Sequence, residues 1–375
     1  MKRCLFLLLL LAAFFLPLAG CERKTAEPPL IRFGHAPHDH HAALYIAALN
    51  PDYFRDNGGV FLREQTFKTD YDLIADGRVI ARLQIVPDEG GIRLIRRLAE
   101  KQVDLAYGGV PAMLVLIDQG SEVRILLPLM GEGAGFVVNR DLPADSWAAF
   151  VEYVQKSPVP VRIGYRIGVS VQNLAFEAAL RSAGLSYSRR VDDDSQAQVV
   201  LLNLHGSDRL FAALESGLID GFVINQPLVA KAEVQQVGRL LVNLRDLPPA
   251  GSWVGMPCCA LAGDESFVRR HPREVAALLS LLKRANDHIN EYPEASALQI
   301  AAWLEIDPEI ERRSLPTIRY SNEFDHNWYR GVNHWLDTMI EGGELKGVVA
   351  AARRENRVDE VIYSSATRDL RRPTP

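Results

Sequence analysis

The sequence is poor in cysteine, and this limits how the fold can be held together. Only four cysteines occur in 375 residues, whereas small disulfide-stapled domains carry a much denser set. Two of the four, Cys258 and Cys259, are neighbours in the chain. Their Cα atoms lie about 3.8 Å apart, which is less than an ordinary disulfide spans. We therefore expect no ordinary structural disulfide and a fold that depends on its apolar core.

The sequence also lacks the short motifs that mark common enzymes. It contains no Gly-x-Ser-x-Gly elbow, no phosphate-binding Walker loop and no Gly-x-Gly-x-x-Gly after a predicted strand. Basic residues are not in excess, because 42 Lys and Arg stand against 47 Asp and Glu. The sequence therefore predicts a protein that is not an enzyme, needs no cofactor and binds no nucleic acid.

No apolar run is long enough to span a membrane. The longest, Leu5 to Leu18, is shorter than the roughly 20 residues a spanning helix needs. It follows two basic residues and leads into Leu18-Ala19-Gly20-Cys21, which resembles the bacterial lipobox. We interpret residues 1–20 as a signal peptide, Cys21 as the acylated (palmitate-type) N-terminus of a mature lipoprotein, and residues 21–29 as a lipidated linker. An ordinary signal peptide with an incidental cysteine is the alternative. The lipid would anchor the protein to the membrane in the periplasm or on the extracytoplasmic face.

The mature chain alternates predicted strands and helices. This order favours βαβ units with mostly parallel sheets, and two such series predict a two-lobed α/β protein with a cleft between the lobes. Residues 30–140 would form the first part of lobe 1, residues 141–255 lobe 2, and residues 256–365 a mainly helical return to lobe 1. Residues 366–375 would be a tail.

Polar residues follow several predicted strands, at the ends where open α/β sheets bind ligands. The turn that carries His35, His38, Asp39, His40 and His41 is the most unusual of them. Glycine allows close approach of backbone to a ligand, and uncharged amides can both donate and accept hydrogen bonds. The candidate contacts are His38, Asp39, His40, Gly108, Gly109, Ser170, Val171, Gln172, Asn225, Gln226 and Cys258. Helix capping is the competing role for Ser170, Asn225 and Gln226.

Several of these stretches, in this order, resemble a known family. They are Asp39 to Ala47, Val103 to Ala112, Val161 to Gly164 with Phe176 to Gly184, Leu218 to Pro227, and Met256 to Leu261. The chain resembles the substrate-binding lipoproteins of ABC importers in the nitrate/sulfonate/taurine and thiamine-pyrimidine-precursor superfamily. This resemblance implies a type II periplasmic binding fold, capture of a small solute by lobe closure, and delivery to a permease with its ATPase. The chain departs from the family pattern at Asn225-Gln226-Pro227, where many relatives carry Glu before the proline.

The cysteine pair and the histidine turn leave two other functions open. The turn from His35 to His41 suggests a metal-binding lipoprotein, since imidazole is a common metal ligand, although its spacing matches no metal motif and we assign no metal ligand. A pyrimidine-synthase-like enzyme is the second alternative, with Cys258 and Cys259 as the only counterpart of the cysteine-rich motif of such enzymes. Alternation along a strand predicts that one of the two thiols points inward and the other outward.

The ligand itself is not specified by the sequence. Nitrate, sulfonate and pyrimidine-like solutes all suit the resemblance. No Arg or Lys lies within the predicted ligand turns, although Arg166 is close, which argues against a strongly anionic ligand. We expect the protein to act as a monomer with a small-molecule solute, an ABC permease and its ATPase as partners.

Overall fold

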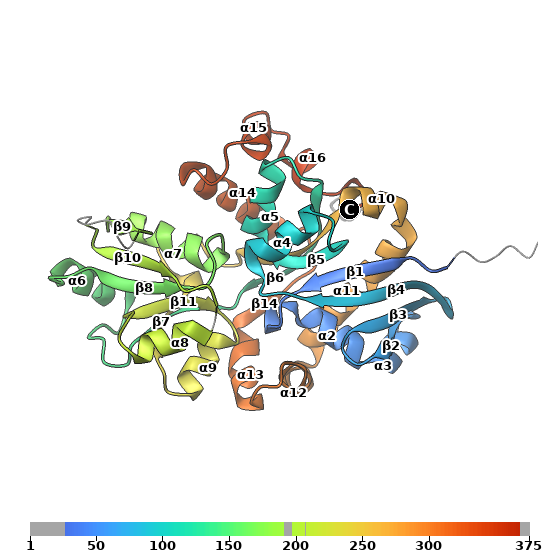
Figure 1. Ribbon diagram of the computed structural model, residues 1–375, viewed down its shortest axis with the longest axis horizontal. Helices are drawn as coiled ribbons and strands as arrows, with labels where there is room; N and C mark the ends of the chain where they lie inside the picture. The colour runs from blue at the N-terminus through green and yellow to red at the C-terminus, as the bar shows by residue number, and fades with distance from the viewer. Residues whose placement is uncertain (1–26, 191–196, 207, 368–375) are drawn as a thin grey trace, which may run out of the picture.

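Two β-sheets with helices on their faces make up the computed structural model (Figure 1). The structure describes residues 27–190, 197–206 and 208–367, so the expected signal peptide, Cys21 and most of the expected tail lie outside the described residues. The two-lobed α/β architecture predicted from the sequence is confirmed. We refer to the part built on the larger sheet as lobe 1 and to the part built on the smaller sheet as lobe 2.

The larger sheet has eight strands in the order β14-β6-β13-β5-β1-β4-β3-β2. Its centre is parallel, because β1 pairs in parallel with both β4 and β5, while the remaining neighbours are antiparallel. Its strands are β1 (Leu30–His35), β2 (Val60–Thr66), β3 (Asp70–Ala75), β4 (Arg78–Pro87), β5 (Leu105–Gly109), β6 (Val123–Glu132), β13 (Pro257–Asp264) and β14 (Ile318–Tyr320).

The smaller sheet has six strands in the order β12-β7-β11-β8-β10-β9. The four strands from β11 to β9 are parallel, and β7 and β12 are added in antiparallel fashion. The prediction of mostly parallel sheets therefore holds for the smaller sheet. It is wrong for the larger sheet, where only the pairs of β1 with β4 and β5 are parallel. The strands are β7 (Ala134–Val138), β8 (Val161–Tyr165), β9 (Tyr187–Ser188), β10 (Val199–Asn203), β11 (Gly221–Asn225) and β12 (Arg239–Asn243).

Helices cover both faces of each sheet. Lobe 2 contains α6 (Trp147–Lys156), α7 (Val171–Ser182), α8 (Asp208–Glu215), α9 (Leu228–Val234) and η2 (Leu244–Asp246). Lobe 1 contains η1 (Asp39–His41), α2 (Ala42–Leu49), α3 (Pro51–Asp56), α4 (Gly91–Ala99), α5 (Val110–Asp118), α10 (Glu265–Arg270), α11 (Pro272–Glu291), α12 (Pro293–Leu304), α13 (Pro308–Ser314), η3 (Leu315–Thr317), α14 (His326–Glu341), α15 (Val348–Arg354), α16 (Val358–Ile362) and η4 (Ser365–Thr367). None of the helices in the described part of the chain is both long enough and apolar enough to span a membrane.

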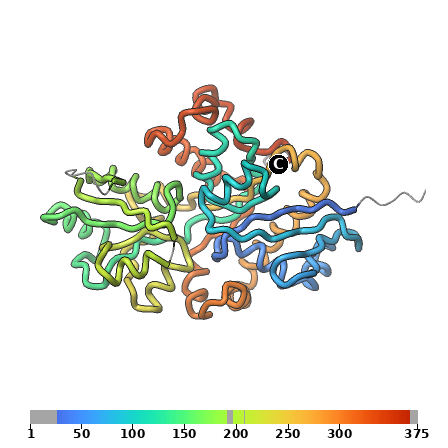
Figure 2. The backbone as a smooth tube through the Cα atoms, viewed as in Figure 1, coloured from blue at the N-terminus to red at the C-terminus, as the bar shows by residue number. Residues whose placement is uncertain are grey.

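The chain passes between the lobes twice (Figure 2). The first passage lies at Gly133, between β6 and β7, because β7 pairs with β11 and β12 of the smaller sheet. The predicted boundary at residue 140 is therefore wrong by one strand, since the sequence around β7 does not reveal which sheet receives it. The second passage lies between η2 and β13. The return segment is not only helical, since β14 adds an edge strand beside β6.

The apolar core is shared between the lobes. One buried cluster extends from α4 and α5 of lobe 1 to Phe136 and Phe176 of lobe 2. A second fills lobe 1 between the larger sheet and α2 and α11, with Phe33 and Tyr45 among its fully buried side chains. On the outer side, α13 of lobe 1 contacts α9 of lobe 2 (Figure 1). The two lobes are thus packed against each other over part of their boundary.

Helix α5 runs from the lobe boundary to a buried anchor. Its residues are all buried, as expected for a helix that is apolar on every side. Its last residue, Asp118, accepts hydrogen bonds from the backbone N–H groups of Lys346, Gly347, Val349 and Ala350 at the start of α15. A carboxylate at a helix N-terminus satisfies donors that the helix leaves unpaired. Asp118 therefore fixes α5, whose other end borders the lobe boundary.

We expect Asp118→Asn to lower the free energy of unfolding by about 3 kcal/mol, because charge-assisted hydrogen bonds are lost and buried N–H groups keep only a neutral acceptor. Urea denaturation followed by circular dichroism measures the change. Asp141→Asn, at an exposed turn residue, serves as the matched control and should change stability by less than about 0.5 kcal/mol. Equal stability of the two variants would contradict the anchoring role of Asp118.

Candidate functional site

The turn between β1 and α2 is buried although its sequence is polar. His35, His38, Asp39, His40 and His41 are each at most 8% exposed. Charged and polar side chains are rarely buried unless they are paired. The turn therefore has to find its hydrogen bonds inside the protein, and its partners define the centre of the candidate site.

The hydroxyl of Tyr45, on α2, is hydrogen-bonded to the backbone of the turn. It lies 3.1 Å from the carbonyl oxygens of Ala36 and His38, and it accepts from the backbone N–H of His38 at 3.2 Å. The Nδ1 atom of His41 accepts the backbone N–H of Ala36 at 2.9 Å. These contacts explain why an irregular backbone is tolerated in the interior, because its polar groups are bonded there. Burial lowers the pKa of His35 to about 3 and lowers that of His38 as well.

His40 points from the turn toward the first passage between the lobes. Its Nε2 atom lies 2.8 Å from the carbonyl oxygen of Gly133. A carbonyl oxygen can only accept, so Nε2 carries the proton and Nδ1 of the neutral ring has a free lone pair. Gly133 has a φ of +63°, and a Cβ atom there would lie 2.8 Å from His40 Nε2. Only glycine suits both the backbone angle and the close approach of this histidine.

Two thiols meet the other side of the His40 ring. Cys258 Sγ lies 3.5 Å and Cys259 Sγ 3.9 Å from His40 Nδ1, and the two sulfur atoms are 3.9 Å apart. Both cysteines are free and buried. Burial lowers the pKa of His40, but its contacts with Cys259 and Asp39 outweigh burial and raise it overall. The hydrogen bond between the thiols raises the pKa of Cys258 and lowers that of Cys259.

The side-by-side thiols contradict the predicted strand alternation. The register between β13 and β6 pairs Pro257 with Gly131 and Cys259 with Met130, so Cys258 is an extra residue on β13. A β-bulge of this kind interrupts the alternation and re-aims a side chain. The prediction that one thiol points away is wrong because the bulge, which depends on the register with β6, turns both toward His40.

Lobe 2 supplies its part of the site from two helix-starting turns. Ser170 caps α7 by accepting the Asn173 N–H, the competing role considered for it. Gln172 contacts Cys258 with its side-chain amide, at a nitrogen-to-sulfur distance of 3.9 Å. Asn225 ends β11 and donates to the carbonyl oxygen of Gln226 at 2.5 Å.

A small cavity of about 40 Å³ lies where these turns meet. It brings together nine predicted contacts, which are His38, His40, Gly108, Gly109, Ser170, Val171, Gln172, Asn225 and Cys258, and it also borders His41, Arg166 and Cys259. Gly108 has a packing reason of its own, because a Cβ atom there would lie 2.5 Å from Ile95 Cδ1. A Cβ atom at Gly109 would make only ordinary van der Waals contact, at 3.7 Å from Val171 and 3.8 Å from the Cys258 carbonyl oxygen.

Two predicted contacts do not border this cavity. Asp39 is fully buried, and its carboxylate accepts a hydrogen bond from the hydroxyl of Ser314. Gln226 accepts the Ala230 N–H at 3.0 Å with its side-chain oxygen and donates to Thr317 at 3.3 Å. Both side chains are used to connect segments of the fold, and the sequence alone did not distinguish this role from ligand contact.

A larger cavity of about 320 Å³ adjoins the small one at Val171 and Cys258. Its other lining residues are Glu132, Gly133, Ala134, Ala175, Asn243, Leu244, Arg245, Asp246, Trp253, Met256, Pro316, Thr317 and Trp335. Apart from Cys258, none of the polar residues of this larger cavity was among the predicted contacts. They lie at the end of β6, around η2 and in η3, and not in a glycine-rich turn. The signal available was Trp253, an aromatic residue in the predicted second passage.

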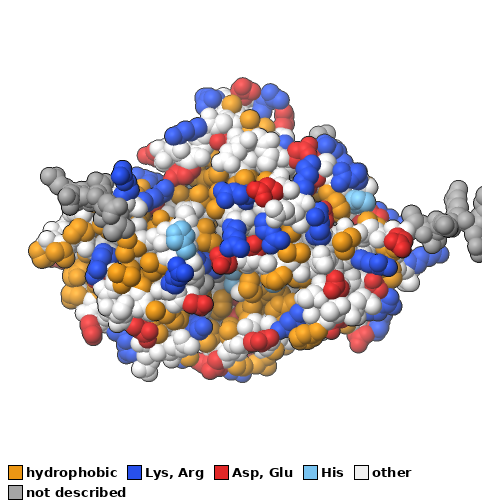
Figure 3. Space-filling model, viewed as in Figure 1, with side chains coloured by type: hydrophobic (Ala, Val, Ile, Leu, Met, Phe, Trp, Pro, Cys, Tyr) orange, Lys and Arg blue, Asp and Glu red, His pale blue; other side chains and the backbone are white. Residues whose placement is uncertain are grey.

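Cations stand closer to the site than the sequence indicated. Arg166 borders the small cavity and an outer hollow that Arg93 and Arg97 of α4 also line. Lys and Arg side chains gather over α4 on the face shown in Figure 3. Arg93 and Arg97 are paired with Asp88 at 3.5 and 3.1 Å. Arg166, in the loop after β8, lines the small cavity. This weakens the argument from the sequence against an anionic ligand.

Comparison with known proteins identifies the family. Residues 24–305 match the NMT1-like family, and the chain belongs to it. The uncharacterised protein MJ1180 of Methanocaldococcus jannaschii is 32% identical over 142 residues, which are 37% of this chain and 98% of that protein. The periplasmic binding fold that the resemblance implied is confirmed, because nitrate- and sulfonate-binding proteins share it.

Solved structures show the same fold at low sequence identity. The nitrate-binding protein NrtA of Synechocystis PCC 6803 has a TM-score of 0.68 at 15% identity, covering 92% of this chain and 88% of that one. A zinc-bound ligand binding component of an ABC-type import system from Staphylococcus aureus has a TM-score of 0.67 at 13% identity, covering 92% and 100%. The alkanesulfonate-binding protein SsuA of Xanthomonas axonopodis pv. citri, bound to MOPS, has a TM-score of 0.63 at 16% identity, covering 87% and 98%.

Two buried carboxyl groups lie behind the turn. Glu311 of α13 is fully buried, and neither of its carboxyl oxygens has a hydrogen-bond partner. Burial, together with the nearby Asp39, raises the pKa of Glu311 to about 10. Burial raises the pKa of Asp39 to about 6. The tyrosines Tyr45 and Tyr320 are also close to this pair. Among the described residues, no positively charged group offsets the burial of Glu311.

We expect the protein to lose stability as pH rises, because the folded state favours neutral Glu311. The stabilisation that comes from neutral Glu311 is fully present below about pH 4.5, the pKa of this side chain in the unfolded chain. It is lost as the pH rises toward about 10, the pKa in the folded protein. Glu311→Gln should flatten the profile and stabilise the protein at pH 9 by on the order of 3 kcal/mol. Urea unfolding at several pH values measures this, with the exposed Glu294→Gln as control. A profile that Glu311→Gln leaves unchanged would contradict the assignment.

Proposed function

We propose that the chain is the solute-binding component of an ABC importer, anchored by lipid at Cys21 on the extracytoplasmic side of the membrane. The observation that carries this proposal is the pair of adjoining cavities at the lobe boundary, lined by residues of both lobes. Ligands of open α/β folds bind at such strand ends. Membership of the NMT1-like family and the fold shared with nitrate- and alkanesulfonate-binding proteins support it.

Capture works by closure of the lobes on the solute. Lobe 1 offers the histidine turn and β13, and lobe 2 offers the start of α7 and the end of β11. A solute that touches both lobes favours the closed state by its differential affinity for that state. The closed pair of lobes then presents one joined surface to the permease, whose ATPase drives release. Gly133, at the first passage, supplies a backbone position that tolerates positive φ.

The solute is a small organic molecule of the nitrate, sulfonate or pyrimidine-like class. The cavity of about 320 Å³ has the size of a small-molecule site. Trp253 and Trp335 give it apolar walls, while Asn243 and Thr317 offer hydrogen-bonding groups. Arg245 is paired with Glu132 at 2.6 Å and lies 3.6 Å from Asp246, so two carboxylates and one guanidinium line this cavity. A planar or partly apolar solute with a few polar atoms suits these walls.

A molecule retained through gentle purification identifies the solute, and Asn243→Ala then tests the site. Native mass spectrometry of the full chain in mild detergent should show the protein with one bound small molecule. Loss of one side-chain hydrogen bond should weaken binding of that molecule about tenfold. Gln235→Ala, at an exposed amide of lobe 2, is the matched control. The proposal fails when no molecule is retained and a metabolite library alters neither melting temperature nor the scattering profile.

Lipid anchoring is tested separately at Cys21, which would carry the acyl chains. In a bacterial host, we expect the mature wild-type protein in the membrane fraction and Cys21→Ser in the soluble extracytoplasmic fraction. Mass spectrometry of the N-terminal peptide should show added acyl groups only in the wild type. Cys258→Ser retains Cys21 and should remain in the membrane fraction. A wild-type protein without acyl groups would remove lipid anchoring and leave solute capture untouched.

A further inference from the structure

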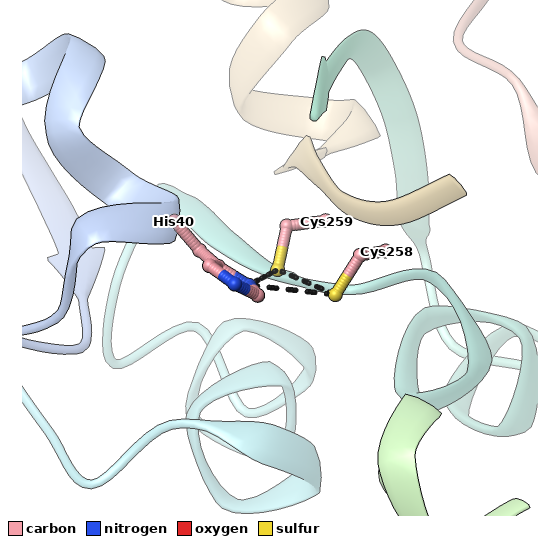
Figure 4. Close-up of side chains that lie close together, drawn as sticks. All are labelled: His40, Cys258 and Cys259. Atoms are coloured by element: carbon pink, nitrogen blue, oxygen red, sulfur yellow. Dashed lines mark hydrogen bonds between the residues drawn. The ribbon is translucent and has the colours of Figure 1, made fainter. Parts of the chain in front are cut away.

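His40, Cys258 and Cys259 bring three metal-binding atoms together inside lobe 1 (Figure 4). Within the part of the chain that the structure describes, this is the only group of three such side chains whose ligand atoms all lie within 4.8 Å of one another. The remaining histidines of the turn are not part of it. This set differs from the one that the sequence suggested, because it takes one histidine of the turn and two cysteines of β13.

The spacing of the three atoms fits one tetrahedral ion. Zinc bonds of about 2.3 Å to sulfur and about 2.0 Å to nitrogen place two sulfurs about 3.8 Å apart and a sulfur and a nitrogen about 3.5 Å apart. The observed separations are 3.9 Å between the sulfurs, and 3.5 and 3.9 Å from the sulfurs to His40 Nδ1. The atoms therefore need to move by only a few tenths of an ångström to bind an ion.

The histidine ring is already oriented as a metal ligand requires. Its Nε2–H donates to the Gly133 carbonyl oxygen, which leaves the lone pair of Nδ1 directed at the thiols. Metal-binding histidines regularly donate their other ring N–H to a carbonyl or carboxylate, because this fixes both the tautomer and the ring orientation. The β-bulge at Cys258 orients the two other ligands on β13, since it turns both thiols toward His40.

The space at this cluster is small and polar. A cavity of about 40 Å³ holds an ion with one or two water molecules and is too small for most organic solutes. Two further buried atoms that border it, His38 Nδ1 and His41 Nε2, have no hydrogen-bond partner. Buried polar atoms are normally paired, so a ligand or water in this cavity is what they lack.

We propose that His40 Nδ1, Cys258 Sγ and Cys259 Sγ bind one Zn²⁺ ion in lobe 1. Each thiol loses its proton to solvent when its sulfur bonds to the ion. Two thiolates and a neutral imidazole then balance the charge of a divalent ion, which matters because all three side chains are at most 5% exposed. The fourth position faces the small cavity, where a water molecule or a donor atom of a solute completes the tetrahedron.

This inference goes beyond the proposed transport role and does not require it. All three ligands come from lobe 1, on η1 and β13. Solute capture, in contrast, depends on residues of both lobes. The two proposals are consequently tested by different variants, and either can fail while the other stands.

The experiment uses the untagged full chain, reduced with a phosphine and stripped of metal. We expect it to bind one equivalent of Zn²⁺ and no Mg²⁺ under the same conditions. Co²⁺ in place of zinc should give the visible bands of a tetrahedral site and an ultraviolet thiolate-to-cobalt charge-transfer band. Cys258→Ser and Cys259→Ser should each lower zinc affinity by at least about 100-fold, because even the loss of an outer-shell partner costs about 10- to 100-fold.

His326→Ala, at an exposed histidine on α14, is the matched control and should bind zinc as the wild type does. Near-ultraviolet circular dichroism of the metal-free variants verifies that they are folded. His40→Gln supplies a further arm, since it should lose the tetrahedral cobalt spectrum while both thiols remain. Substoichiometric zinc in the wild type, or one equivalent retained by the Cys258→Ser/Cys259→Ser double variant, would overturn the proposal.

Discussion

The structure depends on keeping one polar turn out of water. Moving a histidine or an aspartate into the interior costs several kcal/mol unless its polar atoms are bonded there. The bonds come from Tyr45 nearby and from two distant parts of the chain. Tyr45 serves the backbone of the turn, Gly133 accepts from His40, and Ser314 donates to Asp39. The hydroxyl of Tyr320 adds a bond to the Asp39 carbonyl oxygen at 2.6 Å. The return of the chain to lobe 1 is therefore a condition for burying the turn.

The same bonds connect the site to the passage between the lobes. The carbonyl oxygen of Gly133 accepts from His40 Nε2 of lobe 1 and from the backbone N–H of Gln226 of lobe 2, at 2.8 and 2.9 Å. One peptide group is thus shared by the two halves of the molecule. Because a side chain at Gly133 would meet both His40 and Ile318, this contact limits the sequence at the passage as strictly as the backbone angle does.

The sequence predicted what depends on local order, and failed where distant segments meet. The strand-then-turn pattern located nine of the eleven candidate contacts at one cavity, because parallel strands bring their carboxyl ends to one edge. Asp39 departs from this group because Ser314, 275 positions away, takes its carboxylate. The direction of the Cys258 thiol follows from the register of β13 against β6. The sheet that receives β7, and the short edge strand β14, likewise depend on partners that no local pattern names.

The division of the site between the lobes has a consequence for the order of events. The three candidate ligand atoms of His40, Cys258 and Cys259 all belong to lobe 1, on η1 and on β13 of the larger sheet. The distances between these atoms therefore do not depend on how the two lobes are placed. Gln172 and Asn225 reach the same cavity from lobe 2, and in the proposed mechanism their distance from lobe 1 would change when the lobes separate. An ion held by lobe 1 is bound equally well in both states and shifts no equilibrium between them. In the proposed mechanism, closure would be driven by a ligand that also touches lobe 2. An ion at this position would then be a fixed part of the cavity wall, and a solute that contacts α7 and β11 would determine when the lobes close.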